Sequence, residues 1–175
     1  AWAIGLTDST VTLASRSDQL GTVSAANSSI RLASRWTTAE IRSINAAGST
    51  VYVVSGGWMD NTSDAFTMSD ASLLLELDGG TIEGGSIAAS AVESFVVTNN
   101  DGSLIGVTLD ADGQLEEGSV VTVRDGLAVN GVLSLRRTTY NSGNQFATRL
   151  LFSGPDQTLA GTGTVALFSA LTFSQ

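Results

Sequence analysis

The chain has 175 residues, among them 19 glycines and one proline, and it contains neither cysteine nor histidine. The lack of cysteine excludes disulfides and thiol chemistry, and the lack of histidine removes the side chain most often used as a base at neutral pH. A formal net charge of −9 argues against binding to nucleic-acid phosphate or to an acidic membrane surface, and no stretch is apolar enough to span a membrane.

A turn–strand unit recurs four times in the first half of the chain. Its copies begin at Asp8, Asn27, Gly48 and Asp70, at intervals of 19, 21 and 22 residues. Each first residue is of a type that tolerates a left-handed backbone, and a strand with apolar residues at alternate positions follows. The side chains predicted to point inward and stack in columns are Val11, Leu13, Ile30, Leu32, Val51, Val53, Leu73 and Leu75.

A repeat of about 20 residues is typical of leucine-rich repeats and of β-solenoids. The fixed leucine and asparagine positions of leucine-rich repeats are missing here. Small residues at the turns suit solenoid corners, because successive coils stack only about 4.8 Å apart. We therefore predict an all-β parallel β-solenoid with coils of about 20 residues, little or no helix, and a single domain over residues 1–175.

One stretch of the first half also has a helical pattern. Residues 37–40 match a capping box, Ile41 and Ile44 are three apart, and Gly48 could end a helix. The repeat alignment places the same residues in a flank of a coil. We favour the coil flank and keep a short helix as the alternative.

The second half continues with short apolar strands, but the spacing between them varies. Asp125-Gly126 and Asn130-Gly131 are strong turn signals. The irregular spacing predicts inserted loops, and Asp110–Glu117 and Thr138–Phe146 are the candidates.

The second half also resembles a known class of protein. Residues 126–135 read Gly-Leu-Ala-Val-Asn-Gly-Val-Leu-Ser-Leu, and residues 151–154 read Leu-Phe-Ser-Gly, with a further glycine- and threonine-rich segment at 157–165. Together they resemble the coils of bacterial secreted β-solenoids such as autotransporter passengers and filamentous-haemagglutinin-like proteins. The resemblance covers roughly residues 99–167 and is one of repeat style. It implies a right-handed parallel β-helix, secretion, and a place outside the cell or on its surface, and it transfers no catalytic residue.

An acidic segment is the candidate metal site. Asp110, Asp112, Glu116 and Glu117 place four carboxylates within eight positions. Calcium takes roughly six to eight oxygen ligands, which such a cluster can supply, although the spacing is not that of an EF-hand loop. The alternative, which we favour, is a solvated acidic turn. No other cofactor is expected.

Arginine and tryptophan residues are candidates for ligand binding. Arg16 and Arg35 occupy equivalent repeat positions, and with Trp36 they could form a strip that binds an anion or a sugar. Trp2, Trp36 and Trp58 could likewise form a platform for carbohydrate. The alternatives are surface arginines paired with carboxylates, and tryptophans buried in the core or at a coil end.

The sequence favours a structural role over an enzymatic one. A Ser-His-Asp triad is impossible without histidine, and the tandem acidic motif of polysaccharide-cleaving β-helix enzymes is missing. Both ends of the chain are apolar and uncharged, which predicts head-to-tail association of the chain with itself into a homopolymer. The residues predicted to mediate it are Trp2, Ile4, Leu6, Phe168, Leu171 and Phe173. We expect a subunit of an extracellular fibre, sheath or matrix; the alternatives are an adhesin or carbohydrate-binding segment of a larger secreted solenoid and, ranked below both, a polysaccharide-cleaving enzyme.

The calcium hypothesis has a direct thermal test. A ligand that binds only the native state raises its melting temperature by mass action. If Asp110, Asp112 and Glu116 are part of a solvated turn, neither EDTA nor millimolar calcium shifts the melting temperature in differential scanning calorimetry. A rise with calcium that EDTA reverses would instead establish a metal site.

Overall fold

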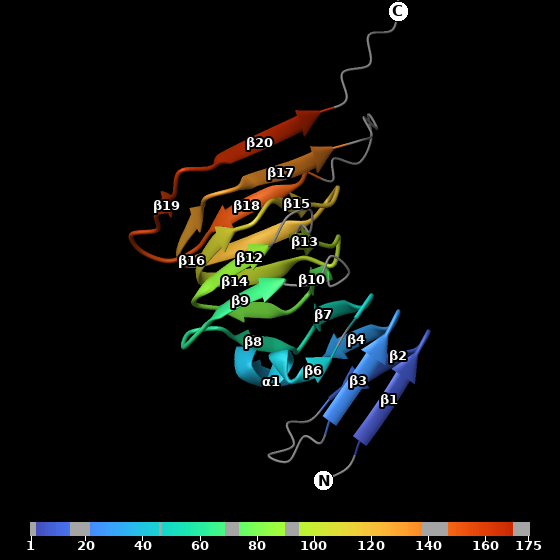
Figure 1. Cartoon of the computed structure of the whole chain (residues 1–175). Helices are drawn as coiled ribbons and strands as arrows, with labels where there is room; N and C mark the ends of the chain where they lie inside the picture. The colour runs from blue at the N-terminus through green and yellow to red at the C-terminus, as the bar shows by residue number, and fades with distance from the viewer. Residues whose placement is uncertain are drawn as a thin grey trace, which may run out of the picture.

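The computed structural model describes residues 3–14, 22–45, 47–68, 74–89, 95–137 and 147–169. These residues form short strands that stack one above another, with the first and the last described strands at opposite ends of the stack (Figure 1). Successive coils pair through parallel ladders, as in the pairing of β2 (Thr10–Leu13) with β4 (Ser29–Leu32). The protein is therefore an all-β parallel β-solenoid, as predicted, and the described part of the chain holds a single five-residue helix, α1 (Thr38–Arg42).

Three sheets form the sides of the solenoid. Sheet 1 has three strands, β1 (Ala3–Thr7), β3 (Thr22–Ala26) and β6 (Ile44–Asn45). Sheet 2 has eight, which are, in stacking order, β2, β4, β7 (Thr50–Val54), β10 (Leu74–Asp78), β13 (Phe95–Val97), β15 (Gly113–Leu115), β17 (Val132–Arg137) and β20 (Thr164–Ser169). Sheet 3 has nine, which are β5 (Arg35–Thr37), β8 (Trp58–Asp60), β9 (Ala65–Met68), β11 (Thr81–Glu83), β12 (Ser86–Ala89), β14 (Gly102–Asp110), β16 (Val120–Val129), β18 (Arg149–Phe152) and β19 (Leu159–Ala160).

The register of sheet 2 confirms the repeat length and corrects one alignment. Thr10 pairs with Ser29 and Ser29 with Thr50, as the sequence repeat predicts. The fourth copy is displaced by two residues: Leu75 lies opposite Val51, whereas the repeat alignment places it opposite Val53. A displacement of two leaves the same side chains pointing inward, so the apolar pattern could not detect it.

Two continuous columns of side chains fill the core behind sheet 2. Ile30, Leu32, Val51, Val53 and Leu75 are at most 1% exposed, which confirms their predicted inward direction. Val11 and Leu13 begin the columns and are half-buried, and Leu73 lies outside the described residues. The first column is Val11, Ile30, Val51, Leu75, Phe95, Gly113, Leu133 and Val165, and the second is Leu13, Leu32, Val53, Leu77, Val97, Leu115, Leu135 and Leu167.

The corner before sheet 2 has the left-handed backbone that the sequence predicts. Asp8, Asn27 and Gly48 have φ values of 47°, 50° and 63°, while Asp70 lies outside the described residues. A glycine, or a short polar side chain that can hydrogen-bond locally, adopts this conformation at the lowest cost.

The residue after each of these corners is a serine, and the three serines form a ladder along the axis. The backbone N–H of Ser9 donates to Oγ of Ser28 at 3.2 Å, and that of Ser28 donates to Oγ of Ser49 at 3.0 Å. Oγ of Ser28 in turn donates to the carbonyl oxygen of Ala26 at 2.8 Å. The ladder satisfies backbone groups that the corner would otherwise bury unpaired.

The stretch after β5 is helical, so the favoured prediction of a coil flank there is wrong and the helical alternative is confirmed. Thr37 caps α1, its Oγ1 accepts from the backbone N–H of Glu40, and the Glu40 carboxylate accepts from the backbone N–H of Thr37 at 2.7 Å. Both halves of the capping box are thus formed. Trp36 and Ile41 are 1% and 3% exposed, and they anchor this turn of helix to the core.

A buried asparagine links the helix to the coils that follow. Asn61 is fully buried, and its Nδ2 donates to the carbonyl oxygens of Gly84 at 3.2 Å and Ser86 at 2.8 Å. Its Oδ1 accepts from Oγ1 of Thr38, the first residue of α1. Every polar atom of the side chain is used, as burial of an amide requires.

One of the two predicted loops contains a strand. Gly113–Leu115, within the acidic segment, forms β15, whose inward-facing Leu115 is 1% exposed. The prediction of a loop over Asp110–Glu117 is therefore wrong at its centre. The strand is only three residues long and lies between acidic residues, so the sequence pattern did not indicate it. The second predicted loop, Thr138–Phe146, lies outside the described residues.

Replacing Ile30 by Asp places a charge in a column where the wild-type side chain has no exposed surface. We expect Ile30→Asp to lower the free energy of unfolding by roughly 3 kcal/mol or more, because the carboxylate has no partner there. Ser29→Asp, on the outward side of the same strand, is the matched control and changes it by about 0.5 kcal/mol at most. Urea unfolding followed by circular dichroism measures both, and equal stabilities would contradict the assigned register.

Candidate self-association site at the solenoid ends

The last described coil leaves core-facing side chains uncovered. β20 pairs with β17 along one edge, and no other described strand pairs with it. Leu135 of β17 is 8% exposed, whereas Leu167, the next member of its column, is 78% exposed. Leu159, which follows Leu127 in sheet 3, is 50% exposed. This end of the described structure is an apolar surface bordered by unpaired strand edges.

The first coil has a similar character. β2 pairs with β4 alone and β1 with β3 alone among the described strands. Val11 and Leu13 are only half-buried, although their neighbours Ile30 and Leu32 in the next coil are completely buried. The first coil therefore covers the side chains of the second coil, while its own inward-facing side chains remain partly exposed to solvent.

The predicted self-association residues fall into three groups. Trp2, Leu171 and Phe173 lie outside the described residues. Ile4 and Leu6 are half-buried in β1, opposite Val23 and Ala25, so they belong to the end surface. Phe168 is 55% exposed but alternates with the inward-facing residues of β20, so its side chain lies on the outer face of sheet 2.

Leu159 and Leu167 are core-facing residues at this end that the sequence analysis did not single out. Their sequence neighbourhood looks like that of any other inward-facing leucine. They differ from other inward-facing leucines only in that no later described coil covers them. This difference depends on how the strands of the last coils pair with those of the coil before.

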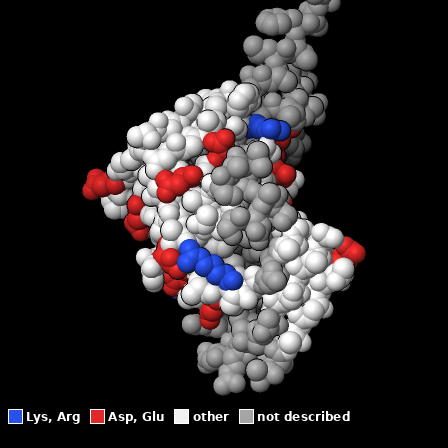
Figure 2. Space-filling view, viewed as in Figure 1, with Lys and Arg blue, Asp and Glu red and all other residues white. Residues whose placement is uncertain are grey.

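Charge is arranged along the sides of the solenoid rather than on these edges. β1, β2 and β20 contain no charged residue. In Figure 2 the surface over β1 and β3 is almost entirely uncharged, while acidic side chains are scattered over the flank of the later coils. Edge strands of monomeric proteins are usually blunted by charge, proline or a covering element, and these strands show no such charge or proline.

Arg35 is held in a surface cluster on sheet 3. Its Nη2 lies 2.7 Å from Oδ2 of Asp60 and 3.1 Å from Oε2 of Glu83, and its guanidinium carbon is 5.1 Å from the ring centre of Trp58. Trp58 Nε1 also donates to Glu83 Oε2 at 3.0 Å. Hydrogen bonds from Thr62 and Arg35 hold the pKa of Asp60 below its ordinary value. The guanidinium already has partners, which agrees with the surface-arginine alternative.

The predicted ligand strip loses its aromatic member. Trp36 is 1% exposed and its indole faces the core, so it is not available to stack on a sugar. Arg16 lies outside the described residues, as does Trp2 of the proposed tryptophan platform. Of the two described tryptophans, Trp58 is the one that is partly exposed, and Arg35 lies over its ring.

The acidic segment is divided by β15, with Asp110 and Asp112 before the strand and Glu116 and Glu117 after it. Asp110 Oδ1 accepts from Nδ2 of Asn130 at 2.6 Å, Asp112 Oδ1 accepts from the backbone N–H of Val132 at 2.8 Å, and Glu116 Oε2 accepts from the backbone N–H of Asn99 at 3.3 Å. Within the described ranges no three acidic side chains come together as a group that could hold a metal ion. Asp110, Asp112 and Glu116 instead join neighbouring coils.

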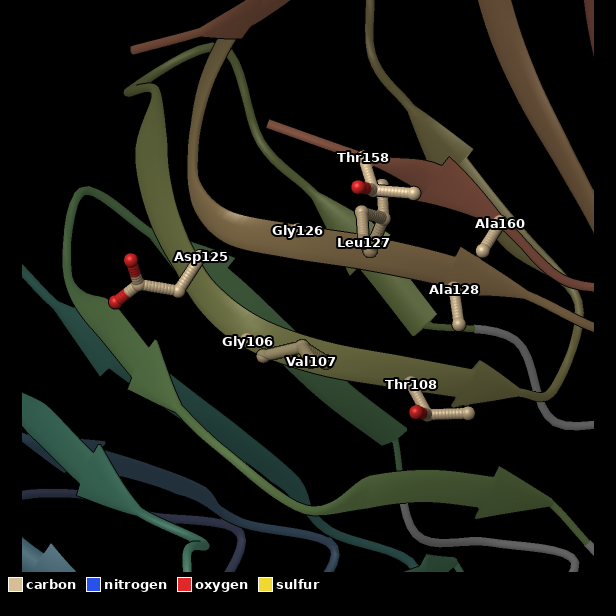
Figure 3. Close-up of a pocket in the computed structure, with 9 residues that line it drawn as sticks. All are labelled: Gly106, Val107, Thr108, Asp125, Gly126, Leu127, Ala128, Thr158 and Ala160. Carbon is tan, nitrogen blue, oxygen red and sulfur yellow. The ribbon is translucent and has the colours of Figure 1, made fainter. Parts of the chain in front are cut away.

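A shallow hollow of about 240 Å³ lies where sheet 3 bends. Gly106 and Gly126, with φ values of 59° and 86°, form the bends of β14 and β16. Figure 3 shows Thr108, Ala128 and Ala160 following one another across neighbouring strands, while the side chain of Asp125 points away from them. Most of the lining residues are small or apolar, and Asp125 is the one charged residue among them.

Asp78 is the centre of a network that fastens several coils together. Its Oδ1 accepts from Oγ1 of Thr98 at 2.8 Å and Nδ2 of Asn100 at 2.6 Å, and its Oδ2 accepts from Nη2 of Arg31 at 2.7 Å. The Arg31 guanidinium crosses the ring of Tyr52, 5.3 Å from its centre. Burial raises the pKa of Asp78, but the hydrogen bonds and the ion pair outweigh this effect and hold the pKa below its ordinary value.

No protein-family model, no curated protein and no solved structure matches this chain. Among the described residues, no helix is both long and apolar enough to cross a membrane.

The Asp78 network predicts a pH-dependent contribution to stability. We expect Asp78→Asn to lower the free energy of unfolding at pH 7 by roughly 1–3 kcal/mol, because a 7%-exposed carboxylate loses charge-assisted hydrogen bonds. A carboxyl group whose pKa is lowered by folding stabilises the protein above its unfolded-state pKa of about 4. The difference between wild type and variant is therefore complete at neutral pH, and it disappears as the pH falls through the lower, folded-state pKa.

Asp64→Asn is the matched control for this experiment. Asp64 pairs with Arg42 at 2.5 Å, but both side chains are more than 40% exposed, so the change costs about 1 kcal/mol or less. Denaturant unfolding from pH 3 to pH 7 measures both variants. An Asp78→Asn effect that stays the same across this range would contradict the assigned network.

Proposed function

We propose that this chain is a non-enzymatic structural protein of the cell exterior whose solenoids join end to end in a fibre, sheath or matrix. The observation that carries the proposal is the uncovered end: Leu167 is 78% exposed although it belongs to a column whose members from Leu32 to Leu135 are buried. An apolar column that reaches solvent gains free energy when another surface covers it.

The two ends of the solenoid are different surfaces, and this determines the kind of assembly. The first coil presents the edges of β1 and β2, and the last described coil presents those of β18, β19 and β20. Contact between two unlike surfaces is heterologous, and when it does not close into a ring it produces a filament. The filament is favoured because these two surfaces lie at opposite ends of the stack of coils (Figure 1).

The use of the charged side chains supports a structural role. Asp60, Glu83 and Asp78 are engaged with arginine or with neighbouring coils, as described above. A carboxylate that acts as a base or nucleophile needs open access to a substrate, which these contacts occupy. These three carboxylates each join neighbouring coils, which supports a structural role for them.

The proposed location rests on the sequence. The repeat style of residues 99–167 resembles that of autotransporter passengers and filamentous-haemagglutinin-like proteins, and this resemblance supports secretion and an extracellular or cell-surface place. The partner that this proposal names is a further copy of the same chain.

The second candidate function is an adhesin or carbohydrate-binding segment. The hollow beside Gly106 and Gly126 favours it, since a bend repeated in successive coils produces a shallow channel that suits an extended chain. The partly exposed Trp58 offers a surface on which a sugar ring could stack if Arg35 moved aside.

Self-association is tested with two leucines of the last coils. Leu167→Asp places a charge on the uncovered column, and we expect it to abolish the growth of assemblies seen for the wild type by light scattering and electron microscopy. Leu151→Asp is the matched control, because Leu151 is also exposed, at 51%, but lies on the outer face of β18. It leaves assembly unchanged.

Deleting residues 1–6 or 168–175 provides a coarser version of the same test. A wild-type protein that stays monomeric at high concentration would overturn the proposal and favour the adhesin segment. Loss of assembly in both leucine variants would show that net charge, rather than the end surface, controls association.

A further inference from the structure

Sheet 2 is the sheet whose two edge strands belong to the first and the last described coils. β2 is its first strand and β20 its last, with six strands between them. In the described structure sheet 1 extends from β1 to β6, and sheet 3 begins at β5, so neither extends from one end to the other. A second copy placed on the same axis would therefore bring β2 of one molecule over β20 of the other.

The side chains of these two strands match position by position. β2 reads Thr10-Val11-Thr12-Leu13, and residues 164–167 of β20 read Thr-Val-Ala-Leu. In both strands the valine and the leucine belong to the inward-facing columns, and the other two side chains face outward. Joining the strands in this register would continue both columns, with valine against valine and leucine against leucine.

The backbone groups of the two edges are complementary in the same register. The N–H of Ser29, the first residue of β4, donates to the carbonyl of Ser9. The N–H of Thr164, the first residue of β20, donates to the carbonyl of Gly131. In both strands the first residue therefore bonds toward the preceding coil. N–H and C=O groups of one residue point to the same side in a parallel strand, and successive residues alternate. Thr10 and Thr12 therefore point away from β4, while Val165 and Leu167 point away from β17. The N–H of Gly163, at the corner before β20, donates to the carbonyl of Val129 in the preceding coil.

Three backbone hydrogen bonds can then form across the joint. The N–H of Val165 reaches the carbonyl of Thr10. The N–H of Thr12 reaches the carbonyl of Val165, and that of Leu167 the carbonyl of Thr12. A shift by one residue would turn the inward-facing side chains outward, and a shift by two would leave one column unpaired.

We infer that the chain polymerises by continuing sheet 2 from one molecule to the next, with Thr164–Leu167 of one copy paired in parallel with Thr10–Leu13 of its neighbour. This inference rests on the proposed function and specifies its joint. The eight strands of sheet 2 give the polymer an axial repeat of roughly 38 Å, from a strand spacing of about 4.8 Å.

Single cysteines test the register directly, because the natural chain has none. Thr12→Cys and Ala166→Cys proteins are mixed, allowed to assemble and oxidised with copper phenanthroline. Both positions face outward, and paired residues of adjacent strands lie within the span of a disulfide. We expect the mixture to shift from monomer to a heterodimer on a non-reducing gel. Thr10→Cys with Thr164→Cys is a second matched pair that should do the same.

Thr12→Cys with Thr164→Cys is the mismatched control, displaced by two residues, and should leave the heterodimer band at background. Filaments that cross-link preferentially in the mismatched pair, or in neither matched pair, would overturn this joint while leaving the proposed function in place. Absence of filaments from the wild-type protein would overturn both. Fibre diffraction supplies a further readout: a strong axial repeat that differs clearly from about 38 Å would also contradict the joint.

Discussion

The parallel backbone ladder between coils is the interaction on which the rest of this structure depends. It fixes the distance between successive coils at about 4.8 Å, so each inward-facing side chain must fit directly against its counterparts above and below. Gly113 illustrates the constraint: it lies between Phe95 and Leu133 in one column, and a Cβ there would come within 2.9 Å of Leu133 Cδ1. The lack of a side chain at Gly113 therefore leaves room for the side chain of Leu133 in the next coil.

Polar groups meet the same constraint by bonding along the axis. The ladder of Ser9, Ser28 and Ser49, the amide of Asn61 and the carboxylate of Asp78 each join neighbouring coils at a corner. In an end-to-end polymer, contacts across the joint would have to provide the attraction between coils that these hydrogen bonds provide within one molecule. With a net charge of −9, such units repel one another side by side, whereas the uncharged strands β2 and β20 do not oppose contact at the ends.

Sequence reasoning reached the fold through features that repeat locally. The left-handed residues Asp8 and Asn27 and the alternation after them predicted the coil, its length and the direction of most side chains. It could not fix the register of the fourth copy, because a shift of two keeps the alternation. It also could not show that Leu167 is uncovered, or that Arg31 and Asp78 meet across 47 positions, because neither fact has a local signal. The sequence left open whether Trp36 is buried or exposed, because the side of the strand on which it lies depends on a corner that the sequence does not define.

The number of residues in a coil changes the width of the solenoid but not its length. From Phe95 to Gly113 a coil of sheet 2 takes 18 residues, and from Val132 to Thr164 it takes 32, yet both coils pair with their neighbours in unbroken parallel register. Added residues are accommodated at the corners, away from the ladder. An insertion there makes the protein broader without lengthening it, whereas duplication of a complete coil lengthens it by one strand spacing. A molecule built this way can vary its surface loops freely while its axial dimension changes only in whole steps.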